Sequence, residues 1–432
     1  MNRKIAVIGS GISGIASAWL LAQRYDVTLI DKNSYIGGHT NTVSITEPDT
    51  GKPLAVDTGF IVYNAPNYPN LVGLFKSLGV TTRATTMSFS ASIVNSGLEY
   101  AGSDINTLFA QRKNIFSPRF LKLVYDILKF NRAAKALIND TKLSQELTLA
   151  EFLKLNNIGL AMQNDYLLPM AAAIWSCAPQ QMASFPARSF AQFFDNHGLL
   201  NVKDRPQWRT VVGGSQVYIG KLLASFAGKI ITNNGVVKVD RTADLIKLTL
   251  KDGLQLEFDD VIIATHADEA LALLAEPTED EQRYLSAFRY QENDTYLHTD
   301  ERLMPKLKSV WSCWNYLTDN SDEAKSAVSV SYWMNELQGL ATASDYFVSL
   351  NPIQPIDQAK IIKRIHYMHP IFDNEAMLAQ KQLQDLQGKQ HTWFAGSYFG
   401  YGFHEDGLTS AVTVAKSFGI EIPWESLRDE PE

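Results

Sequence analysis

The sequence has little cysteine, no excess of positive charge and no long apolar run. Its two cysteines, Cys177 and Cys313, are too few for a disulfide scaffold and fit a reducing compartment. A net charge of −7 offers no broad basic surface for nucleic acid. No uninterrupted apolar stretch reaches the roughly 18 residues that a membrane-spanning helix needs.

What is present is the composition of an enzyme with more than one domain. The chain has 432 residues, of which 45% are apolar and 20% charged. This composition is ordinary for a soluble globular enzyme, and the length exceeds what one hydrophobic core usually carries. The apolar run at 4–8 is broken by Gly9 and Ser10 and is too short for a signal peptide. We therefore expect two interleaved domains in a cytoplasmic protein.

The N-terminus has the spacing of a dinucleotide-binding βαβ unit. Residues 4–8 predict a buried parallel strand, 15–24 a helix, and 27–30 a second strand. Asp31 ends that second strand, at the position of the acid that accepts ribose hydroxyls. A solvated strand-end acid is the alternative interpretation of Asp31.

Three glycines, Gly9, Gly11 and Gly14, lie between the first strand and the helix. Gly9 permits the tight turn, Gly11 lets the backbone approach a pyrophosphate, and Gly14 lets helix and strand pack closely. The free N–H groups of the following helix favour an anion there. This fingerprint does not distinguish NAD from FAD.

Downstream segments resemble FAD enzymes of the amine-oxidase and phytoene-desaturase superfamily. The similar segments are Gly37-Gly38-His39-Thr40, Val211-Val212-Gly213-Gly214, the strand from Val236 to Arg241, residues 260–265, and Trp393-Phe394-Ala395-Gly396 with Gly407 and Ser410. The resemblance implies an α/β fold, with a discontinuous Rossmann-like FAD-binding domain and an inserted α+β substrate domain. We expect the FAD domain at 1–80, 210–284 and 388–432, and the substrate domain at 81–209 and 285–387.

Three motifs resemble a bacterial family of predicted FAD-binding oxidoreductases. They are Gly37 to Thr42, Asp57 to Asn64 and Gly400 to Gly407, and the similarity covers nearly the whole chain. Members are commonly associated with cyclopropane-fatty-acid-synthase-like methyltransferases. The resemblance therefore implies lipid acyl chains as the substrate class and a methyltransferase as a candidate partner.

The resemblance and the fingerprint together imply a set of cofactor-binding residues. These are Gly9, Gly11, Ser13, Gly14, Asp31, Lys32, Gly38, His39, Thr40, Gly59, Val236, Gly396, Ser397, Asp406, Gly407 and Leu408. Two of them depart from the superfamily pattern. His39 replaces an Arg or Lys after Gly-Gly, and Ser397 replaces an acid of the C-terminal motif.

The candidate catalytic residues lie before the last predicted helix and beside the second glycine segment. His404 is a candidate general acid or base because histidine ordinarily titrates near neutrality, and Glu405 is a lesser candidate. Asp406 suits either a helix cap or a cofactor contact. Tyr63, with Phe60 and Tyr401, is a candidate for an aromatic wall at the flavin, and core packing is the alternative.

Two further patterns bear on metals and membranes. His366-x-x-His369 lies in a probable strand, where the odd spacing turns the two side chains to opposite faces, so we expect no metal site. Residues 112–135 carry seven cations against Asp126 alone, with apolar residues at one-face helical spacing. Such a segment suits either an anionic membrane surface or an ordinary domain helix, and it suggests peripheral contact with the inner membrane face.

The sequence therefore predicts an FAD-dependent oxidoreductase that transfers hydride to or from an unsaturated or methylated acyl chain. Three other functions remain open: a flavin-dependent double-bond isomerase, an amine oxidase, and a non-catalytic flavoprotein partner of a lipid methyltransferase.

Overall fold

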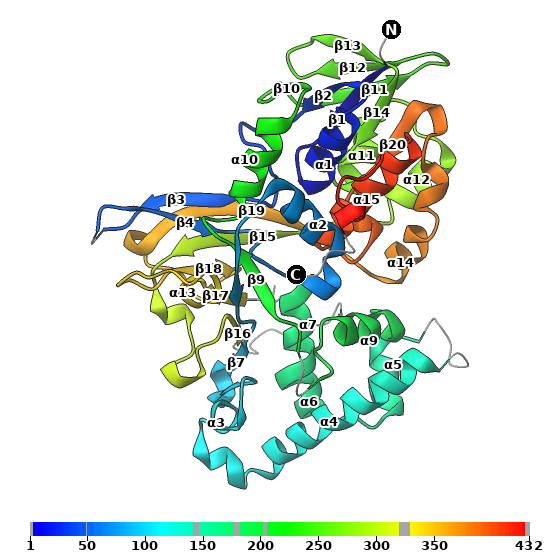
Figure 1. The fold of residues 1–432 in the computed structure, drawn as a ribbon. Helices are drawn as coiled ribbons and strands as arrows, with labels where there is room; N and C mark the ends of the chain where they lie inside the picture. Colours follow the sequence, from blue (N-terminus) through cyan, green and yellow to red (C-terminus); the bar gives the residue numbers. More distant parts are fainter. Residues whose placement is uncertain are drawn as a thin grey trace.

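A five-stranded parallel sheet forms the upper part of the molecule (Figure 1). The computed structural model describes residues 3–48, 50–140, 147–175, 182–201, 205–318 and 329–427, so Cys177 lies outside the described residues. The strand order is β10 (Lys229–Ile231), β2 (Asp26–Ile30), β1 (Lys4–Ile8), β14 (Asp260–Ile263) and β20 (Thr392–Phe394). All neighbouring pairs are parallel. Segments from the start, middle and end of the chain thus form one sheet.

The two faces of this sheet are covered by different helices. Ile5, Val7 and Ile262 pack in a core with helices α1 (Ile12–Leu21), α2 (Pro69–Leu78), α10 (Gln216–Ser225) and α15 (His404–Ser417). Alternate residues, Ala6 and Ile263 among them, belong to the core that includes α11 (Ala267–Leu273), α12 (Glu279–Leu285) and α14 (Asn374–Gln380). The continuous apolar runs of the strands follow from this burial on both faces.

A seven-stranded sheet of mixed direction lies beside and below the parallel sheet (Figure 1). Its order is β19 (Ile361–Ile371), β15 (Arg289–His298), β18 (Phe347–Leu350), β17 (Ser329–Trp333), β16 (Trp314–Thr318), β7 (Phe89–Ile93) and β8 (Leu98–Ala101). Its pairs are antiparallel except β16 with β7. Its strands all fall within 81–209 and 285–387, the expected substrate segments.

Helices close the lower end of the molecule (Figure 1). They are α3 (Ile105–Leu108), α4 (Pro118–Asn139), α5 (Leu149–Leu155), α6 (Leu160–Met162), a π-helical turn at Gln163–Leu167, α7 (Leu168–Trp175) and α9 (Ala187–Asn196). α4 buries Phe120, Leu123, Phe130, Ala134 and Leu137, one turn after another. Within the described chain, no helix is long and apolar enough to cross a membrane.

Smaller sheets accompany the two large ones. β3 (Thr42–Thr46) pairs with β4 (Pro53–Asp57), and β11 (Val236–Arg241), β12 (Ile246–Leu250) and β13 (Gln255–Phe258) form a separate sheet. β9 (Trp208–Val211) pairs with β5 (Val62–Asn64) and β6 (Thr82–Thr85). β9 crosses the boundary expected at 209/210, so the exact division into domains remains a proposal.

Backbone contact between glycines fixes the start of α1. Gly9 has a φ of +96°, which favours glycine, and its N–H donates to Ile30 at 2.8 Å. A Cβ on Gly14 would lie 1.8 Å from the carbonyl oxygen of Gly9. Helix and turn therefore approach more closely than any side chain permits. The expected α/β fold with a Rossmann-like parallel sheet is confirmed.

Gly14→Ala should lower the free energy of unfolding by about 3 kcal/mol, because the added methyl overlaps a backbone oxygen that cannot move alone. Gly220→Ala is the matched control, since its helical Cβ meets nothing within 4 Å. That change should raise stability by about 0.5–1 kcal/mol. Urea titrations of both variants test this. Equal stability of Gly14→Ala and wild type would show that the packing argument is wrong.

Candidate dinucleotide site and adjoining apolar chamber

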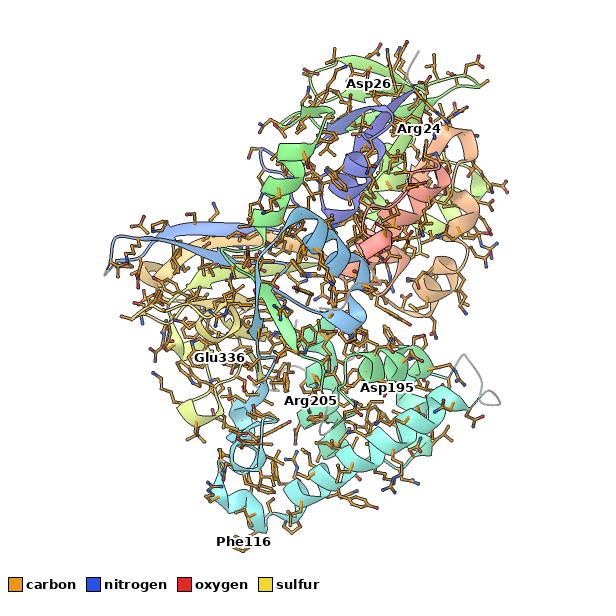
Figure 2. The ribbon with its side chains drawn as sticks, viewed as in Figure 1. Arg24, Asp26, Phe116, Asp195, Arg205 and Glu336 are labelled. Carbon is orange, nitrogen blue, oxygen red and sulfur yellow. The ribbon has the colours of Figure 1, made fainter. Side chains whose placement is uncertain are left out.

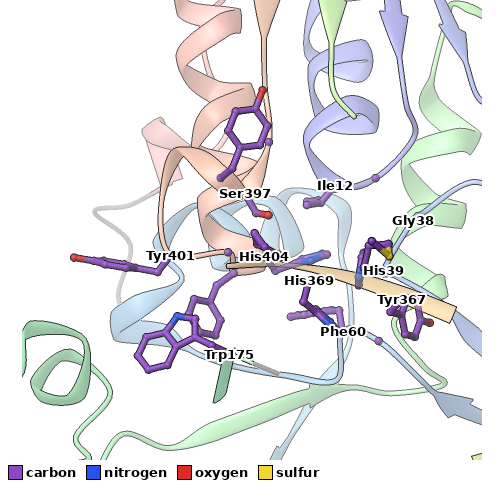
Figure 3. Close-up of a pocket in the computed structure, with 18 of the residues that line it drawn as sticks. Ile12, Gly38, His39, Phe60, Trp175, Tyr367, His369, Ser397, Tyr401 and His404 are labelled. Atoms are coloured by element: carbon purple, nitrogen blue, oxygen red, sulfur yellow. The ribbon is translucent and has the colours of Figure 1, made fainter. Parts of the chain in front are cut away.

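One cavity of about 870 Å³ extends from the Gly9 turn into the space between the seven-stranded sheet and the lower helices. Its upper end is lined by backbone and polar groups from the Gly9–Ser13 turn, Asp31 and Lys32. Its lower end is lined mainly by aromatic and aliphatic side chains. Figure 3 shows the middle, where His39, His369 and His404 lie near Phe60, above Trp175.

The upper end is a cradle open to a ligand. Gly11 precedes the first turn of α1, and a Cβ built on it would meet no atom within 4 Å. No side chain caps α1, and its first turn contains no acid. The first N–H groups of the helix therefore remain available to an anion, which the helix dipole also favours.

Asp31 and Lys32 lie at the side of this cradle. Asp31 Oδ2 accepts from the N–H of Ser10 at 2.8 Å and from its hydroxyl at 2.5 Å, and Oδ1 accepts from the N–H of Asn33 at 2.7 Å. Lys32 pairs with Glu269 at 2.6 Å. A carboxylate has about four acceptor positions, so the lining carboxylate of Asp31 retains capacity for a ligand hydroxyl.

Most of the expected cofactor-binding residues line this cavity. They are Gly9, Gly11, Ser13, Asp31, Lys32, Gly38, His39, Gly59, Val236, Gly396 and Ser397. Gly38 and Gly59 also permit close packing, since a Cβ on Gly38 would lie 2.9 Å from Gly11 Cα, and one on Gly59 2.2 Å from His39 O.

Five expected cofactor-binding residues lie outside the lining: Gly14, Thr40, Asp406, Gly407 and Leu408. Gly14 and Gly407 act through packing, because a Cβ on Gly407 would lie 2.8 Å from the hydroxyl oxygen of Ser13. Leu408 is fully buried in the core beside α1. The structure thus gives these residues supporting positions behind the cavity wall.

The two acids in the first turn of α15 do not line the cavity. Glu405 accepts from the N–H groups of Asn70 at 2.8 Å and Leu71 at 3.0 Å, at the start of α2. Asp406 accepts from the N–H groups of Tyr401 at 3.0 Å and Phe403 at 2.8 Å. Burial raises the pKa of Glu405 to about 7 and that of Asp406 to about 6. Glu405 thus holds the start of α2, and its catalytic role stays a prediction, while Asp406 caps α15 as its third residue rather than preceding it.

Tyr63 is also displaced from its expected position. Its side chain is 3% exposed, packs edge-on against Phe75 and Tyr68, and donates to Thr82 Oγ1 at 3.2 Å. It does not line the cavity, whereas Tyr68 and Phe60 do. The core-packing alternative therefore describes Tyr63, because the three-residue strand β5 turns its ring toward α2.

His404 lies at the cavity wall with one ring nitrogen bound to the protein. Its Nε2 is 2.6 Å from the hydroxyl of Tyr218, which in turn is 2.6 Å from Thr40 Oγ1. Phe60 stacks on the imidazole at 3.9 Å with an interplanar angle of 9°. Burial lowers the pKa of His404 to about 3, so it is neutral at pH 7 and does not titrate near neutrality as the sequence predicted. Sequence spacing gives no indication of the contact with Tyr218.

A chain of amide groups fixes the tautomer of His369. Asn351 accepts from the N–H of Asp294 at 2.9 Å, so its NH₂ group is the one that faces Asn293 Oδ1, at 2.7 Å. Asn293 therefore presents its own NH₂ to Nδ1 of His369, at 2.9 Å. His369 Nδ1 accepts, and the proton resides on Nε2. Burial lowers the pKa of His369 to about 4, which keeps the ring neutral.

His39 completes a group of uncharged histidines in the cavity wall. It stacks on Tyr367 at 4.7 Å and lies 5.4 Å from the ring of His369 and 6.4 Å from that of His266. Burial lowers the pKa of His39, and the neighbouring histidines lower it further. His39 Nε2 is buried without a hydrogen-bond partner among the described residues. A buried polar atom without a hydrogen-bond partner destabilises the protein unless a ligand supplies that partner.

The lower end of the cavity is an apolar chamber. Its walls include Phe89, Tyr100, Tyr166, Met170, Ile174, Trp175, Phe193, Leu199, Trp208, Trp314, Tyr332 and Leu350. Asp31 and Glu269 are the two carboxylates among the described lining residues, and both lie at the cradle end. Arg205 is the described cation of the chamber. These walls suit an uncharged apolar group.

The histidines at 366 and 369 diverge, as their odd spacing predicted. Both residues line the cavity, but His366 Nδ1 lies 2.7 Å from Asp294 with its side chain 53% exposed, whereas His369 Nδ1 bonds to Asn293 at 2.9 Å. Across the described residues, no group of three or more His, Cys, Asp or Glu side chains is arranged to hold a metal. His369 was nevertheless missed as a cavity residue, since the sequence gives no signal for its contact with Asn293.

The fold and the cavity together define a class of protein. Proteins of this class bind a dinucleotide cofactor at the cradle and enclose a substrate in the adjoining chamber. The chain belongs to the flavin-containing amine oxidoreductase family, whose model matches residues 12–415. It is 24% identical to an L-amino-acid oxidase of Siganus canaliculatus over 305 residues, which are 64% of this chain and 52% of the relative. The chain thus spans little more than half the length of that relative.

Solved structures share the fold over nearly the whole chain. The fatty acid isomerase from P. acnes that produces CLA aligns with a TM-score of 0.68 and 16% identity, over 96% of this chain and 98% of the isomerase. Putrescine oxidase aligns with a TM-score of 0.68 and 13% identity, over 98% and 100% of the two chains. At these identities the similarity shows the fold alone.

The family implies FAD, and the residues of the cavity fit it. The open space at Gly11 and the uncapped start of α1 suit a pyrophosphate, and Asp31 suits a ribose. The unpartnered Nε2 of His39 lies further along the same cavity, where a polar atom of the ligand would satisfy it. These residues would hold the cofactor between the cradle and the chamber.

Purified protein should be yellow and contain about one FAD per chain. Gly11→Ala should leave the melting temperature of the cofactor-free protein unchanged, because its Cβ meets no protein atom, yet should reduce FAD retention by occupying the cradle. Asp31→Ala should weaken FAD binding at least tenfold through the loss of charge-assisted hydrogen bonds. Absorbance after gel filtration measures both. A colourless native protein that binds NAD and no flavin would contradict the assignment.

Proposed function

We propose that this protein is an FAD-dependent oxidoreductase that transfers hydride to or from an unsaturated or methylated lipid acyl chain. The observation that carries the proposal is the apolar chamber continuous with the cradle, whose described walls contain aromatic and aliphatic side chains and no carboxylate. Transfer of an acyl chain from water to such walls lowers its free energy by roughly 0.8 kcal/mol per CH₂ group. A charged amine would find no described carboxylate there to pair with.

The residues of the chain position the substrate and exclude water, while bound FAD supplies the electron chemistry. Phe60 holds the imidazole of His404 in one plane, and Tyr218 engages its Nε2, so Nδ1 is the ring nitrogen left to hydrogen-bond a ligand. Nδ1 donates if the Tyr218 hydroxyl donates to Nε2, and accepts if Nε2 donates to that hydroxyl. His369 offers an Nε2–H donor, because its Nδ1 accepts from Asn293. The aromatic walls keep water from the reacting carbon.

The comparisons support this function and one alternative. The fatty acid isomerase that shares the fold acts on an acyl chain, which favours a lipid substrate and keeps double-bond isomerisation, with no net redox change, as the second candidate. Family membership and the similarity to an L-amino-acid oxidase and to putrescine oxidase favour amine oxidation instead. The walls of the chamber favour the lipid. A methyltransferase that modifies acyl chains would be a partner consistent with this substrate.

Unsaturated fatty acids should reduce the bound flavin under anaerobic conditions, and primary amines should not. Stopped-flow absorbance measures the reduction. If the reaction is an isomerisation, double-bond migration should occur without an added electron acceptor, which gas chromatography of the products detects. Reduction by amines at rates above those with lipids would refute the proposal.

His404→Ala should slow this reduction by roughly 10²-fold or more while FAD content remains near wild type. Tyr218→Phe is the matched variant, because it keeps the ring and removes the contact to Nε2. Since the pKa of His404 is about 3, the wild-type rate should show no inflection near pH 6.5 from this residue. An unchanged rate in His404→Ala would make the residue structural.

We further propose peripheral contact between residues 112–135 and the inner face of the cytoplasmic membrane. The expected single apolar face of this segment is corrected: Phe120 is buried, whereas Leu121, Tyr125 and Leu128 are 46%, 64% and 52% exposed. α4 thus has one stripe on the core and a second in solvent. Phe116, 86% exposed, lies at the lower tip of the molecule (Figure 2). Exposed apolar residues among cations are typical of an interfacial helix.

Binding to anionic vesicles should weaken with salt, and binding to neutral vesicles should be slight. Lys129→Glu plus Arg132→Glu should weaken the anionic binding. Lys122 is avoided because it pairs with buried Asp126 at 2.9 Å. Lys247→Glu plus Lys251→Glu, on the β12–β13 hairpin at the opposite end, is the charge-matched control. Equal flotation of both double variants at low salt would eliminate α4 as the contact.

A further inference from the structure

A second cavity, of about 490 Å³, lies where the β7–β8 hairpin meets the start of the basic segment. Its walls come from three separate parts of the chain: the hairpin around Gly97, the turn at 110–113, and residues 306–307. It shares no lining residue with the large cavity. Nothing in the proposed hydride transfer uses it.

Three cations converge on this second cavity. Arg112 and Lys113 come from the basic segment, and Lys306 comes from a loop almost two hundred residues later. None of the three forms an ion pair with a described carboxylate, whereas nearby Lys308 pairs with Glu301 at 3.7 Å. A chain with a net charge of −7 thus gathers unpaired positive charge at one hollow.

The one acid in its wall is already satisfied by other donors. Glu99 is 6% exposed and accepts from the backbone N–H groups of Lys306 at 2.8 Å and Leu307 at 3.0 Å, and from Ser92 Oγ at 3.0 Å. These bonds hold the Lys306 loop against the hairpin. The carboxylate therefore positions the loop. Arg112 Nη1 donates to the carbonyl of Phe109 at 3.2 Å, and the three cations retain further N–H groups for a ligand.

Exposed apolar side chains accompany these cations. Val94 and Leu307, which line the cavity, are 48% and 36% exposed, and Ile115 and Phe116, just beyond Lys113, are 43% and 86% exposed. A site for a free anion gains nothing from such residues, whereas a membrane surface presents phosphate groups directly above hydrocarbon. The cations suit the phosphate groups of a membrane surface, and the apolar rim suits its hydrocarbon.

We propose that this cavity binds the phosphate group of an anionic phospholipid, with Arg112, Lys113 and Lys306 as its partners. The proposal extends the proposed membrane contact by adding a specific headgroup site to the nonspecific attraction of α4. Lys306 distinguishes the headgroup site from the nonspecific attraction of α4, because Lys306 lies outside residues 112–135. The site would orient the protein with Phe116 toward the bilayer.

Sedimentation of the FAD-loaded protein with vesicles tests this site. The vesicles contain phosphatidylcholine alone or mixed with phosphatidylglycerol. Lys306→Glu should weaken binding to the mixed vesicles at least about fivefold, the effect of one or more cations near an anionic surface, and Lys306→Met should give a smaller loss in the same direction. Lys251→Glu, the charge-matched control at the far end, should bind within about twofold of wild type.

Three results would overturn the proposal. The first is binding of Lys306→Glu to the mixed vesicles as tight as that of wild type. The second is an equal loss of binding in Lys251→Glu, which would leave net charge as the cause. Alternatively, millimolar inorganic phosphate protects the protein thermally in a Lys306-dependent way while vesicle binding ignores Lys306, which would assign the cavity to a free anion. Flavin reduction by a detergent-dispersed fatty acid is measured on the same samples. It reports on the proposed reaction independently, so the two proposals can fail separately.

Discussion

The contact between backbone and backbone at the Gly9–Gly14 turn is the constraint on which the rest of the structure depends. At Gly14, α1 comes directly against the carbonyl of Gly9, and at Gly407, α15 comes against the side chains of Ile12 and Ser13 at the start of α1. Two helix N-termini are thereby brought to one end of the parallel sheet. One forms the cradle, and the other places His404 in the wall of the same cavity. A side chain at Gly14 would push α1 away from Gly9, and one at Gly407 would push α15 away from the start of α1.

Burial gives this cavity its electrostatic character. His39, His369 and His404 all have lowered pKa values because their rings are removed from water. They act as neutral hydrogen-bonding groups, and the amide chain from Asn351 through Asn293 decides which nitrogen of His369 carries its proton. The formal charges among the described lining residues are concentrated at the cradle, with Arg205 as the described cation of the chamber. The polarity of the cavity thus falls from the anion-binding end toward the apolar end.

The features that could be predicted from the sequence are those encoded by near neighbours. The glycine turn, the strand ending at Asp31 and the odd spacing of His366 and His369 depend on a few consecutive residues. The contacts of His404 with Tyr218, and of Glu405 with the start of α2, join positions 186 and 335 residues apart. Single-sequence periodicity also cannot tell which apolar stripe of α4 meets the core. For these reasons most of the lining around the cradle was predictable, while the surroundings of Tyr63, Glu405 and Asp406 were not.

The proposed membrane face and the chamber share a wall. Phe120, on the buried stripe of α4, meets Tyr100 edge-on at 5.7 Å, and Tyr100 lines the chamber. The next residue, Leu121, faces solvent on the same helix. The thickness of one helix therefore separates the surface proposed to meet lipid from the space proposed to hold an acyl chain. Since each CH₂ group exposed to water costs about 0.8 kcal/mol, a chain that passes from bilayer to chamber at this end avoids most of that cost. We propose that the basic α4 and the chamber, whose described walls hold no carboxylate, together serve to move an apolar chain without exposing it to water.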